Sequence, residues 1–489
     1  MYISKHGFVV KKEEISKDEL KSLKKELVAK PIGDSNYKNN DSDYPVYIET
    51  INKLYIPKMF GKNKYKNCKV KELDEYTGKD IDVSFSGELR PEQKDVYNIM
   101  VDKLKEKKGA ILQASAGCGK TIMCLKIITE LKKKTLIIVN KISLLTQWKQ
   151  EIEKFIPGAR VGIIQGKKSC DTDDKDIIVG MLQSLARIDY PEDKLKEIGM
   201  VCVDEIHHLG ARLFSQVFFK VTSLYTLGLS ATPNRSDGLE YVFKWHVGDI
   251  ECKKVIESKG KEPVVRIVKL NLQTDEYKEI KRKDYNGKDV LMYTSMISEL
   301  VQMKERNEII VKIITDKVKE KVENEHRKIL VLSERREHVE NLRNLYEDVK
   351  EDDEYTSDLF LGGMKSKQLE NAKKARVIFA TYKAFGEGID EKDLNCLILT
   401  TPKKYISNFT LQNKKRDNGS LEQIVRRIIR KDHLELHPEI IDIYDDFSIY
   451  KSHANSRKVF YKKHFTKYIL KQEEFEIDNS QKIENKTIL

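Results

Sequence analysis

Short runs of apolar residues alternate with helix-length segments over most of the chain. In the first half these runs lie at Gly109 to Gln113, Thr135 to Val139, Asp176 to Leu182, Val201 to Asp204 and Tyr225 to Leu229. A second series lies at Lys328 to Ser333, Asp358 to Leu361, Arg376 to Thr381 and Cys396 to Thr401. Buried parallel strands read as continuous apolar runs separated by helices, so the pattern predicts an α/β fold with two tandem parallel-sheet lobes.

The flanking segments follow other patterns. Residues 1–85 contain a charged helical stretch, Ser16 to Ala29, then a polar loop and the short apolar segment YIPKMFG. Residues 252–325 are charged and helix-prone, and the end of the chain is rich in Lys, Asn and Glu. The expected organisation is an N-terminal accessory domain at 1–85, a first lobe at 86–251, a helical bridge at 252–325, a second lobe at 326–471 and a disordered tail at 472–489.

Composition narrows the class of protein. The 489 residues are enough for about three domains with cores of their own. With 90 Lys and Arg against 78 Asp and Glu, the net charge of +12 favours a polyanionic partner. The seven cysteines are scattered and never form a Cys-x-x-Cys pair, which argues against zinc or disulfide scaffolding. With no membrane-length apolar run and no signal-like N-terminus, we expect no membrane partner and a reducing intracellular compartment.

Residues 109–121 read GAILQASAGCGKT, a buried strand followed by a glycine-rich turn. Small residues let backbone N–H groups point at anionic oxygens in front of a helix N-terminus. Lys120 then supplies a charge for the β and γ phosphates, and Thr121 a hydroxyl for Mg²⁺. The expected phosphate-binding residues are Ala116, Gly117, Cys118, Gly119, Lys120 and Thr121. Ala114 stands where the strict P-loop pattern has glycine, and a flexible turn before an ordinary helix is the alternative interpretation.

A second candidate site follows in MVCVDEIHH, residues 200–208, which reads as a buried strand ending in carboxylates. In open α/β sheets ligands gather beyond the carboxyl ends of strands. Asp204 is therefore expected to reach the Mg²⁺ held by Thr121, and Glu205 to position the attacking water. A strand that simply stops in solvated acids is the alternative, and His207 alone is more often structural than functional.

Two further segments, SATP at residues 230–233 and QxxRRxxR at residues 423–430, complete an ordered set. P-loop, DEIH, SAT and QxxRRxxR in this order resemble a superfamily 2 DExH helicase over about residues 85–450. The resemblance implies two RecA-like lobes, ATP and Mg²⁺ as cofactors, and nucleic acid as partner. It also implies that Arg427 and Arg430 are arginine fingers, on one helix face with Gln423. Arg426 departs from the glycine that many relatives carry.

Weaker segments fit the same resemblance. Gln93, in LRPEQ, matches the residue that reads adenine in the family, although a surface helix start would look the same. In FATYKAFGEGID, Thr381 would touch the nucleic-acid backbone, while Gly388 and Asp390 would approach the nucleotide. A tight turn that needs glycine is the other interpretation there. Trp148, in VNKISLLTQW, is expected to pack in the core rather than stack on a base.

Residues 451–471 contain seven Lys or Arg and no acid, with Phe460, Tyr461, Phe465 and Tyr468 between them. Such a stretch could grip phosphates and stack on bases. It could equally form an amphipathic helix whose aromatic side chains pack on the second lobe. The sequence does not choose between these two interpretations.

The wording of several segments, LRPEQ, DEIHHLGA, SATPNRSDGL, EGID and DDFS…RKVFYKKHF, looks closest to the transcript-release DNA helicases of poxviruses and other large DNA viruses. These in turn resemble the xeroderma pigmentosum group B helicase. The resemblance implies a 3′ to 5′ DNA-dependent ATPase in transcription, with the transcription machinery as a partner and the cytoplasm, a viral factory or the virion as its location.

Three alternatives remain open at this stage. An RNA helicase would share the same backbone-tracking segments. A translocase subunit of a restriction or repair nuclease would need a nuclease site, and Glu49 and Lys53 are too far apart for the usual acid-x-lysine arrangement. A nucleic-acid-binding scaffold with a dead ATPase would not need the intact Lys120, Asp204 and Glu205.

Overall fold

The computed structural model divides the chain into two compact units, the first spanning Met1–Ile256 and the second spanning Glu257–Ser407 and Asp417–Leu489. The structure describes residues 1–31, 43–115, 117–167, 169–210, 212–231, 233, 237–254, 260–272, 277–284, 287–386, 391, 393–404, 424–425, 427–428, 433–465, 468–477 and 486–487. Among the helices in these ranges, none combines the length and apolar character needed to cross a bilayer.

An eight-stranded sheet in the order β11-β10-β12-β9-β13-β14-β8-β15 forms the centre of the first unit. Its strands are β8 (Gly109–Ala114), β9 (Thr135–Val139), β10 (Val161–Gln165), β11 (Ser169–Cys170), β12 (Ile177–Met181), β13 (Met200–Asp204), β14 (Tyr225–Ser230) and β15 (Ile250–Lys254). Every pairing is parallel except that of β10 with β11. The predicted α/β class is therefore confirmed, and the five apolar runs of the first half each form a strand.

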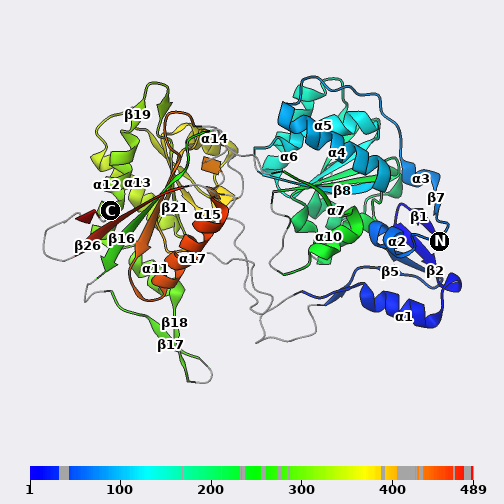
Figure 1. Ribbon diagram of the computed structural model, residues 1–489, viewed down its shortest axis with the longest axis horizontal. Helices are drawn as coiled ribbons and strands as arrows, with labels where there is room; N and C mark the ends of the chain where they lie inside the picture. Colours follow the sequence, from blue (N-terminus) through cyan, green and yellow to red (C-terminus); the bar gives the residue numbers. More distant parts are fainter. Residues whose placement is uncertain are drawn as a thin grey trace. The chain divides into compact units, whose positions relative to one another are not determined.

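Helices cover both faces of this sheet (Figure 1). They are α4 (Pro91–Lys107), α5 (Lys120–Leu131), α6 (Ile142–Phe155), α7 (Leu182–Arg187), α8 (Glu192–Leu195), α9 (Arg212–Ser215) and α10 (Glu240–Val247), with 3-10 turns at Ile206–Gly210 and Gln216–Phe219. Neighbouring residues of β8 show the two-sided burial, because Leu112 packs with the core of α4, α5 and α6, and Ile111 packs with the core of α7 and α10. Burial on both faces explains why these strands are continuous apolar runs.

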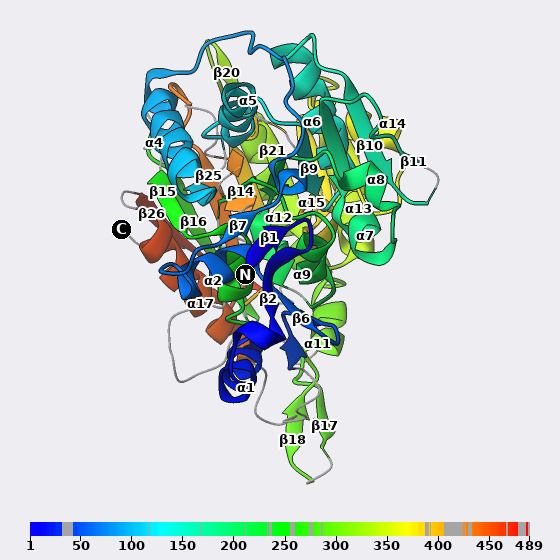
Figure 2. The same cartoon turned by 90° about the vertical axis from the view of Figure 1, so that its right-hand side faces the viewer.

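The first 85 residues form a smaller sheet in the order β5-β6-β2-β1-β7. Figure 2 labels four of these strands, β1, β2, β6 and β7. Its strands are β1 (Tyr2–Ser4), β2 (Gly7–Lys11), β5 (Ile48–Glu49), β6 (Lys53–Ile56) and β7 (Lys71–Glu72). A separate pair joins β3 (Val28–Ala29) to β4 (Tyr44–Pro45), and the helices are a 3-10 turn (Lys12–Glu14), α1 (Lys17–Glu26), α2 (Lys58–Lys64) and α3 (Asp74–Thr77). Ser16 caps α1, since its hydroxyl accepts from the backbone N–H of Glu19 at 3.1 Å.

This accessory segment packs closely against the large sheet of the same unit. The buried ammonium of Lys58 donates to the carbonyl oxygens of Lys108 (2.9 Å), Ser223 (3.0 Å) and Leu224 (3.1 Å), which precede β8 and β14. Burial holds the pKa of Lys58 well below its ordinary value. The accessory segment thus contacts the starting ends of β8 and β14, opposite to their carboxyl ends.

The second unit contains another eight-stranded sheet, in the order β22-β23-β21-β24-β25-β16-β26-β27. Its strands are β16 (Val264–Leu272), β21 (Ile329–Ser333), β22 (Ser357–Phe360), β23 (Val377–Thr381), β24 (Cys396–Leu399), β25 (Glu439–Asp445), β26 (Ile469–Ile477) and β27 (Lys486–Thr487). The helices are α11 (Tyr293–Leu300), α12 (Lys304–Val318), α13 (Arg336–Val349), α14 (Ser366–Lys374), α15 (Tyr382–Gly386) and α17 (Ser448–His464). Two small antiparallel pairs, β17 (Lys281–Lys283) with β18 (Asp289–Leu291) and β19 (Lys321–Val322) with β20 (Glu325–His326), complete the unit.

Two expected boundaries differ from this arrangement. The range 252–325, expected to be a helical bridge, contributes β16, a central strand of the second sheet. The range 472–489, expected to be disordered, begins inside β26, which runs parallel to β16 through Ile477. The two strands support each other through ion pairs, Arg266 with Glu473 at 2.5 Å and Lys269 with Glu474 at 2.8 Å. Because these charged residues interrupt the apolar pattern, the sequence did not indicate buried strands in either segment.

Residues 451–464 of the basic and aromatic stretch near the C-terminus belong to α17 (Ser448–His464), and the aromatic side chains of this helix lie in the core. Phe460 and Tyr461 are buried, and the Tyr461 hydroxyl donates to Asp442 at 2.8 Å. Arg457 is buried as well and forms an ion pair with the same carboxylate at 2.8 Å. Of the two interpretations, the amphipathic helix packed on the second sheet is confirmed, because buried rings offer no face to a base.

His246 of α10 makes the stability of the first unit sensitive to acid. Its ring packs against Phe218 and Phe219, with Nε2 buried and without a hydrogen-bond partner, and burial lowers its pKa from 6.5 to about 3. Below about pH 6.5 the His246 ring binds a proton in the unfolded chain but not in the folded protein. The free energy of unfolding is therefore not reduced by this group above that pH, and it falls as the pH decreases toward 3.

We therefore expect wild-type protein to lose about 2 kcal/mol from this site between pH 7 and pH 5, and a His246→Leu variant to lose none of it. Thermal denaturation at the two pH values measures the effect as a midpoint that falls several degrees further in wild-type protein. Equal declines in both proteins would contradict the assignment.

Candidate active site

The glycine-rich turn lies between the end of β8 at Ala114 and the start of α5 at Lys120. Gly117 and Gly119 adopt φ angles of 86° and 77°, a left-handed region that favours glycine. Ala114 is the last residue of β8 and fully buried, so the position where the strict pattern has glycine is an ordinary strand position here. Ala116 lies outside the described residues.

Lys120 and Gln93 both contact the backbone of this turn. The Lys120 ammonium donates to the carbonyl oxygens of Ala114 at 2.9 Å and Ser115 at 3.4 Å. The buried Gln93 side chain, from the first turn of α4, donates to the carbonyl oxygen of Cys118 at 3.0 Å. A Cβ atom at Gly119 would lie only 2.2 Å from Gln93 Nε2, so a larger residue would displace this amide, and the left-handed φ of 77° also favours glycine.

Asp204 ends β13 at the same edge of the sheet at which β8 ends, because both strands run parallel to β14 between them. One carboxylate oxygen accepts from the backbone N–H of Glu205 at 3.0 Å, and the other accepts from the indole N–H of Trp148 at 2.9 Å. Burial and the negative charge of Glu205 raise the pKa of Asp204 to about 6. The Trp148 hydrogen bond and the positive charge of Lys120 oppose that rise in pKa.

Glu205, His207 and Ser230 form a polar triangle beside Asp204. The Ser230 hydroxyl donates to Glu205 Oε2 at 3.3 Å, and His207 Nδ1 lies 3.4 Å from the same oxygen and 3.2 Å from Ser230 Oγ. Glu205 has a φ of 52°, a strained conformation for a non-glycine residue that the surrounding structure must maintain. The SAT segment thus touches the acidic segment, as β14 lies next to β13.

Trp148 is the residue at this site whose contact the sequence did not reveal. Its indole is 1% exposed, which confirms the expected core packing. The hydrogen bond to Asp204 is additional, and it joins α6 to the end of β13. A Trp in a core helix usually needs a partner for its N–H, and that rule is the only sequence signal for such a contact.

The remaining predicted site residues are in the second unit. Arg427 donates to the carbonyl oxygen of Phe385 at 2.8 Å and lies over the Phe385 ring at 4.7 Å. The hydroxyl of Thr381 accepts from the backbone N–H of Ala384 at 3.3 Å. Gln423, Arg430, Gly388 and Asp390 lie outside the described residues.

The side chains at the edge of the first sheet fit a magnesium nucleoside triphosphate. The turn offers glycines with left-handed φ angles and an ammonium that donates to two backbone carbonyl oxygens of the described residues. Thr121 and Asp204 supply the hard oxygen donors that Mg²⁺ prefers. Within the described ranges no group of three His, Cys, Asp or Glu could hold a metal ion. Magnesium commonly uses one or two carboxylates and completes its shell with phosphate and water, so this small donor set suits it.

The curated relatives of this chain described below are both viral proteins named as helicases. Residues 86–235 match the family model described as "Type III restriction enzyme, res subunit". A protein of Acanthamoeba polyphaga mimivirus, provisionally named an ATP-dependent RNA helicase, is 32% identical over 94% of this chain and 85% of its own length. A provisionally named helicase of Invertebrate iridescent virus 6 is 27% identical, over 87% of this chain and 92% of its own length.

One solved structure is similar in fold. It is a fragment provisionally assigned as an HsdR subunit of a type I restriction enzyme from Vibrio vulnificus, with a TM-score of 0.52 and 17% sequence identity. The similarity covers 82% of this chain and 71% of that chain. At this level of identity it supports the two-sheet α/β fold alone.

Proposed function

Because the chain belongs to the superfamily 2 helicases, with relatives in large DNA viruses, we propose that it is an ATP-driven DNA helicase acting in viral transcription. The resemblance of its segments to transcript-release helicases and to the xeroderma pigmentosum group B helicase supports the choice of DNA as substrate and of transcription as process. The expected partners are a DNA strand and the transcription machinery, in a reducing compartment of the infected cell.

The observation that supports ATP hydrolysis best is the shared sheet edge, because β8, which leads into the turn of Lys120, and β13, which ends at Asp204, finish on the same side of the sheet. In the proposed site Lys120 and the turn bind the phosphates, and Thr121 and Asp204 hold Mg²⁺. Gln93 borders the adenine. From the resemblance to the family, we propose that Gly388, Asp390, Gln423, Arg427 and Arg430 also take part in nucleotide binding or hydrolysis.

Glu205 is proposed to orient the attacking water. Ser230 donates to one of its carboxylate oxygens at 3.3 Å, which fixes the side chain and leaves the other oxygen for that water. Lys120 and the arginines stabilise the charge that develops as the γ-phosphoryl group transfers. Mg²⁺, when bound, neutralises phosphate charge and favours in-line attack. Each of these roles acts through position and charge rather than through covalent chemistry.

A translocase subunit of a restriction or repair nuclease is less favoured, because the contacts of the accessory segment do not suit a nuclease site there. Glu49, the one acid weighed there for a nuclease site, instead forms ion pairs with Lys12 and Lys24 at 2.8 Å each. A carboxylate held by two ammonium groups is poorly suited to bind a catalytic metal ion.

An RNA helicase is the alternative that a specific observation favours, because the mimivirus relative carries that name. Strand displacement separates the two: matched DNA and RNA duplexes with 3′ single-stranded tails are incubated with the protein and ATP. We expect the DNA duplex to be unwound at least about 10-fold faster, because the 2′-hydroxyl is the group by which a protein distinguishes RNA from DNA at a given site. Faster unwinding of the RNA duplex would move the proposal to an RNA substrate, and duplexes with 5′ tails provide the polarity control.

A further inference from the structure

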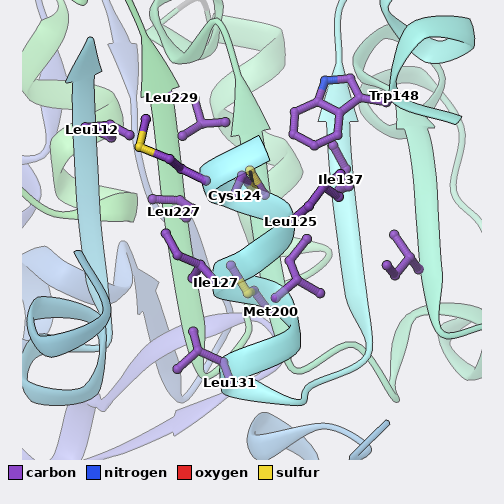
Figure 3. Packing of buried hydrophobic residues seen from close by; sticks show 14 of the residues in the cluster. Leu112, Cys124, Leu125, Ile127, Leu131, Ile137, Trp148, Met200, Leu227 and Leu229 are labelled. Atoms are coloured by element: carbon purple, nitrogen blue, oxygen red, sulfur yellow. Dashed lines mark hydrogen bonds between the residues drawn. The ribbon is translucent and has the colours of Figure 1, made fainter. Parts of the chain in front are cut away.

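Trp148 contacts the proposed metal ligand Asp204 and has no role in the reaction proposed above. It comes from the second turn of α6, and its ring packs in the core formed by α4, α5, α6 and one face of the large sheet. Figure 3 shows the indole at the edge of this packed group, above Ile137 of β9. The ring carbons therefore lie in an apolar environment that fixes the orientation of the N–H group.

That N–H group meets the carboxylate of Asp204 at 2.9 Å. Because the other Asp204 oxygen accepts from the backbone N–H of Glu205 at 3.0 Å, each oxygen has one donor. Two donors from fixed directions define the plane of a carboxylate and leave its remaining lone pairs pointing along set directions. The orientation of the Asp204 carboxylate thus depends on two donors. The backbone N–H of Glu205 is present whatever the side chain at that position, whereas the indole N–H of Trp148 can be removed by substitution.

We propose that Trp148 is a positioning residue, whose indole N–H holds the Asp204 carboxylate in the orientation that binds Mg²⁺ of the nucleotide. The inference rests on the proposed function, because it assigns the orientation of a ligand within that site. Groups that hydrogen-bond a metal ligand from behind change metal affinity or activity by about 10- to 100-fold when removed. Trp148 occupies such a place relative to Asp204, and the apolar packing of its ring makes it rigid.

Trp148→Phe removes the N–H and keeps an aromatic ring in the core. The affinity of a fluorescent ATP analogue is measured with Mg²⁺ and with EDTA. In wild-type protein Mg²⁺ is expected to tighten binding. In the variant we expect this gain to shrink about 10-fold, with unchanged affinity in EDTA and a higher Mg²⁺ concentration for half-maximal hydrolysis. An unchanged Mg²⁺ gain in a folded variant would overturn the proposal, whereas wild-type protein that binds no nucleotide would overturn the proposed function instead.

The chain offers a matched control in Trp245, the other of its two tryptophans. This residue of α10 contacts the rings of Phe60 and Tyr241, and Trp245→Phe is expected to leave the Mg²⁺ gain unchanged. The same variant keeps the test valid if Trp148→Phe fails to fold. When the Trp245→Phe variant is labelled with ¹⁵N-tryptophan, its single indole N–H signal in the NMR spectrum belongs to Trp148. We expect that signal to shift when ADP and Mg²⁺ are added together, but not when ADP and EDTA are added. An indole chemical shift that is the same with Mg²⁺ and with EDTA would contradict the inference.

Discussion

Replacing Lys120 by alanine is expected to lower kcat/KM for ATP by at least about 100-fold, because a preorganised charge at the transferring phosphoryl group is lost. The fold should tolerate this change. In the structure the Lys120 ammonium is partly exposed and donates to two carbonyl oxygens at the end of β8, so no buried partner is left with an unpaired charge. Steady-state phosphate release with saturating DNA measures the effect.

Lys126→Ala is the matched control for this prediction. Lys126 also lies on α5, and its ammonium is 5.0 Å from the centre of the Phe85 ring, so the substitution removes a charge from the same helix without touching the turn. We expect near wild-type hydrolysis in this variant. Turnover by Lys120→Ala at the wild-type rate would mean that the glycine-rich turn is not the phosphate site.

Glu205→Gln is expected to retain nucleotide binding with Mg²⁺ and to slow hydrolysis by about 10²- to 10⁴-fold. Glutamine has the same shape, and its amide oxygen can still accept from Ser230, so the polar triangle and the left-handed backbone at this position are preserved. The negative charge that orients the water is lost. Single-turnover hydrolysis alongside equilibrium binding of the nucleotide separates the chemical step from binding.

Glu153→Gln provides the corresponding control. Glu153 is exposed on α6 and pairs with Lys149 at 3.8 Å, an interaction worth about 0.5 kcal/mol or less. Its amide variant should hydrolyse ATP like wild-type protein. If Glu205→Gln and Glu153→Gln were equally active, Glu205 would have no part in orienting the water.

The sequence predicted the strands whose two faces are both covered by helices. Thr135 to Val139 was predicted to the residue, and Tyr225 to Leu229 ended one residue early. Strands covered by helices on both faces are short uninterrupted apolar runs, which makes them easy to locate in a sequence. The pattern failed where buried charges interrupt it. β25 reads EIIDIYD, and its Asp442 and Asp445 are buried only because Arg457 and Arg306 pair with them from helices. No local pattern announces such long-range pairing.

The placement of Lys120 and Asp204 at one edge of the sheet could also be predicted from the sequence. Spacing and residue type indicated Lys120, Asp204 and Glu205 without a structure, because phosphate and magnesium chemistry permits few side chains at a strand end. The contact of Trp148 with Asp204 joins residues 56 apart in the sequence, and the packing of Gln93 on Gly119 depends on how α4 meets the turn. Contacts of this kind come from tertiary packing, which the sequence pattern does not encode locally.

The most direct test of the account is steady-state phosphate release by the full chain with ATP and Mg²⁺, measured without polymer and with single-stranded DNA, duplex DNA or RNA added in turn. The account predicts turnover that single-stranded DNA stimulates strongly and that Lys120→Ala abolishes. Binding of nucleotide and DNA without turnover under any of these conditions would contradict it, and would identify the chain as a nucleic-acid-binding scaffold.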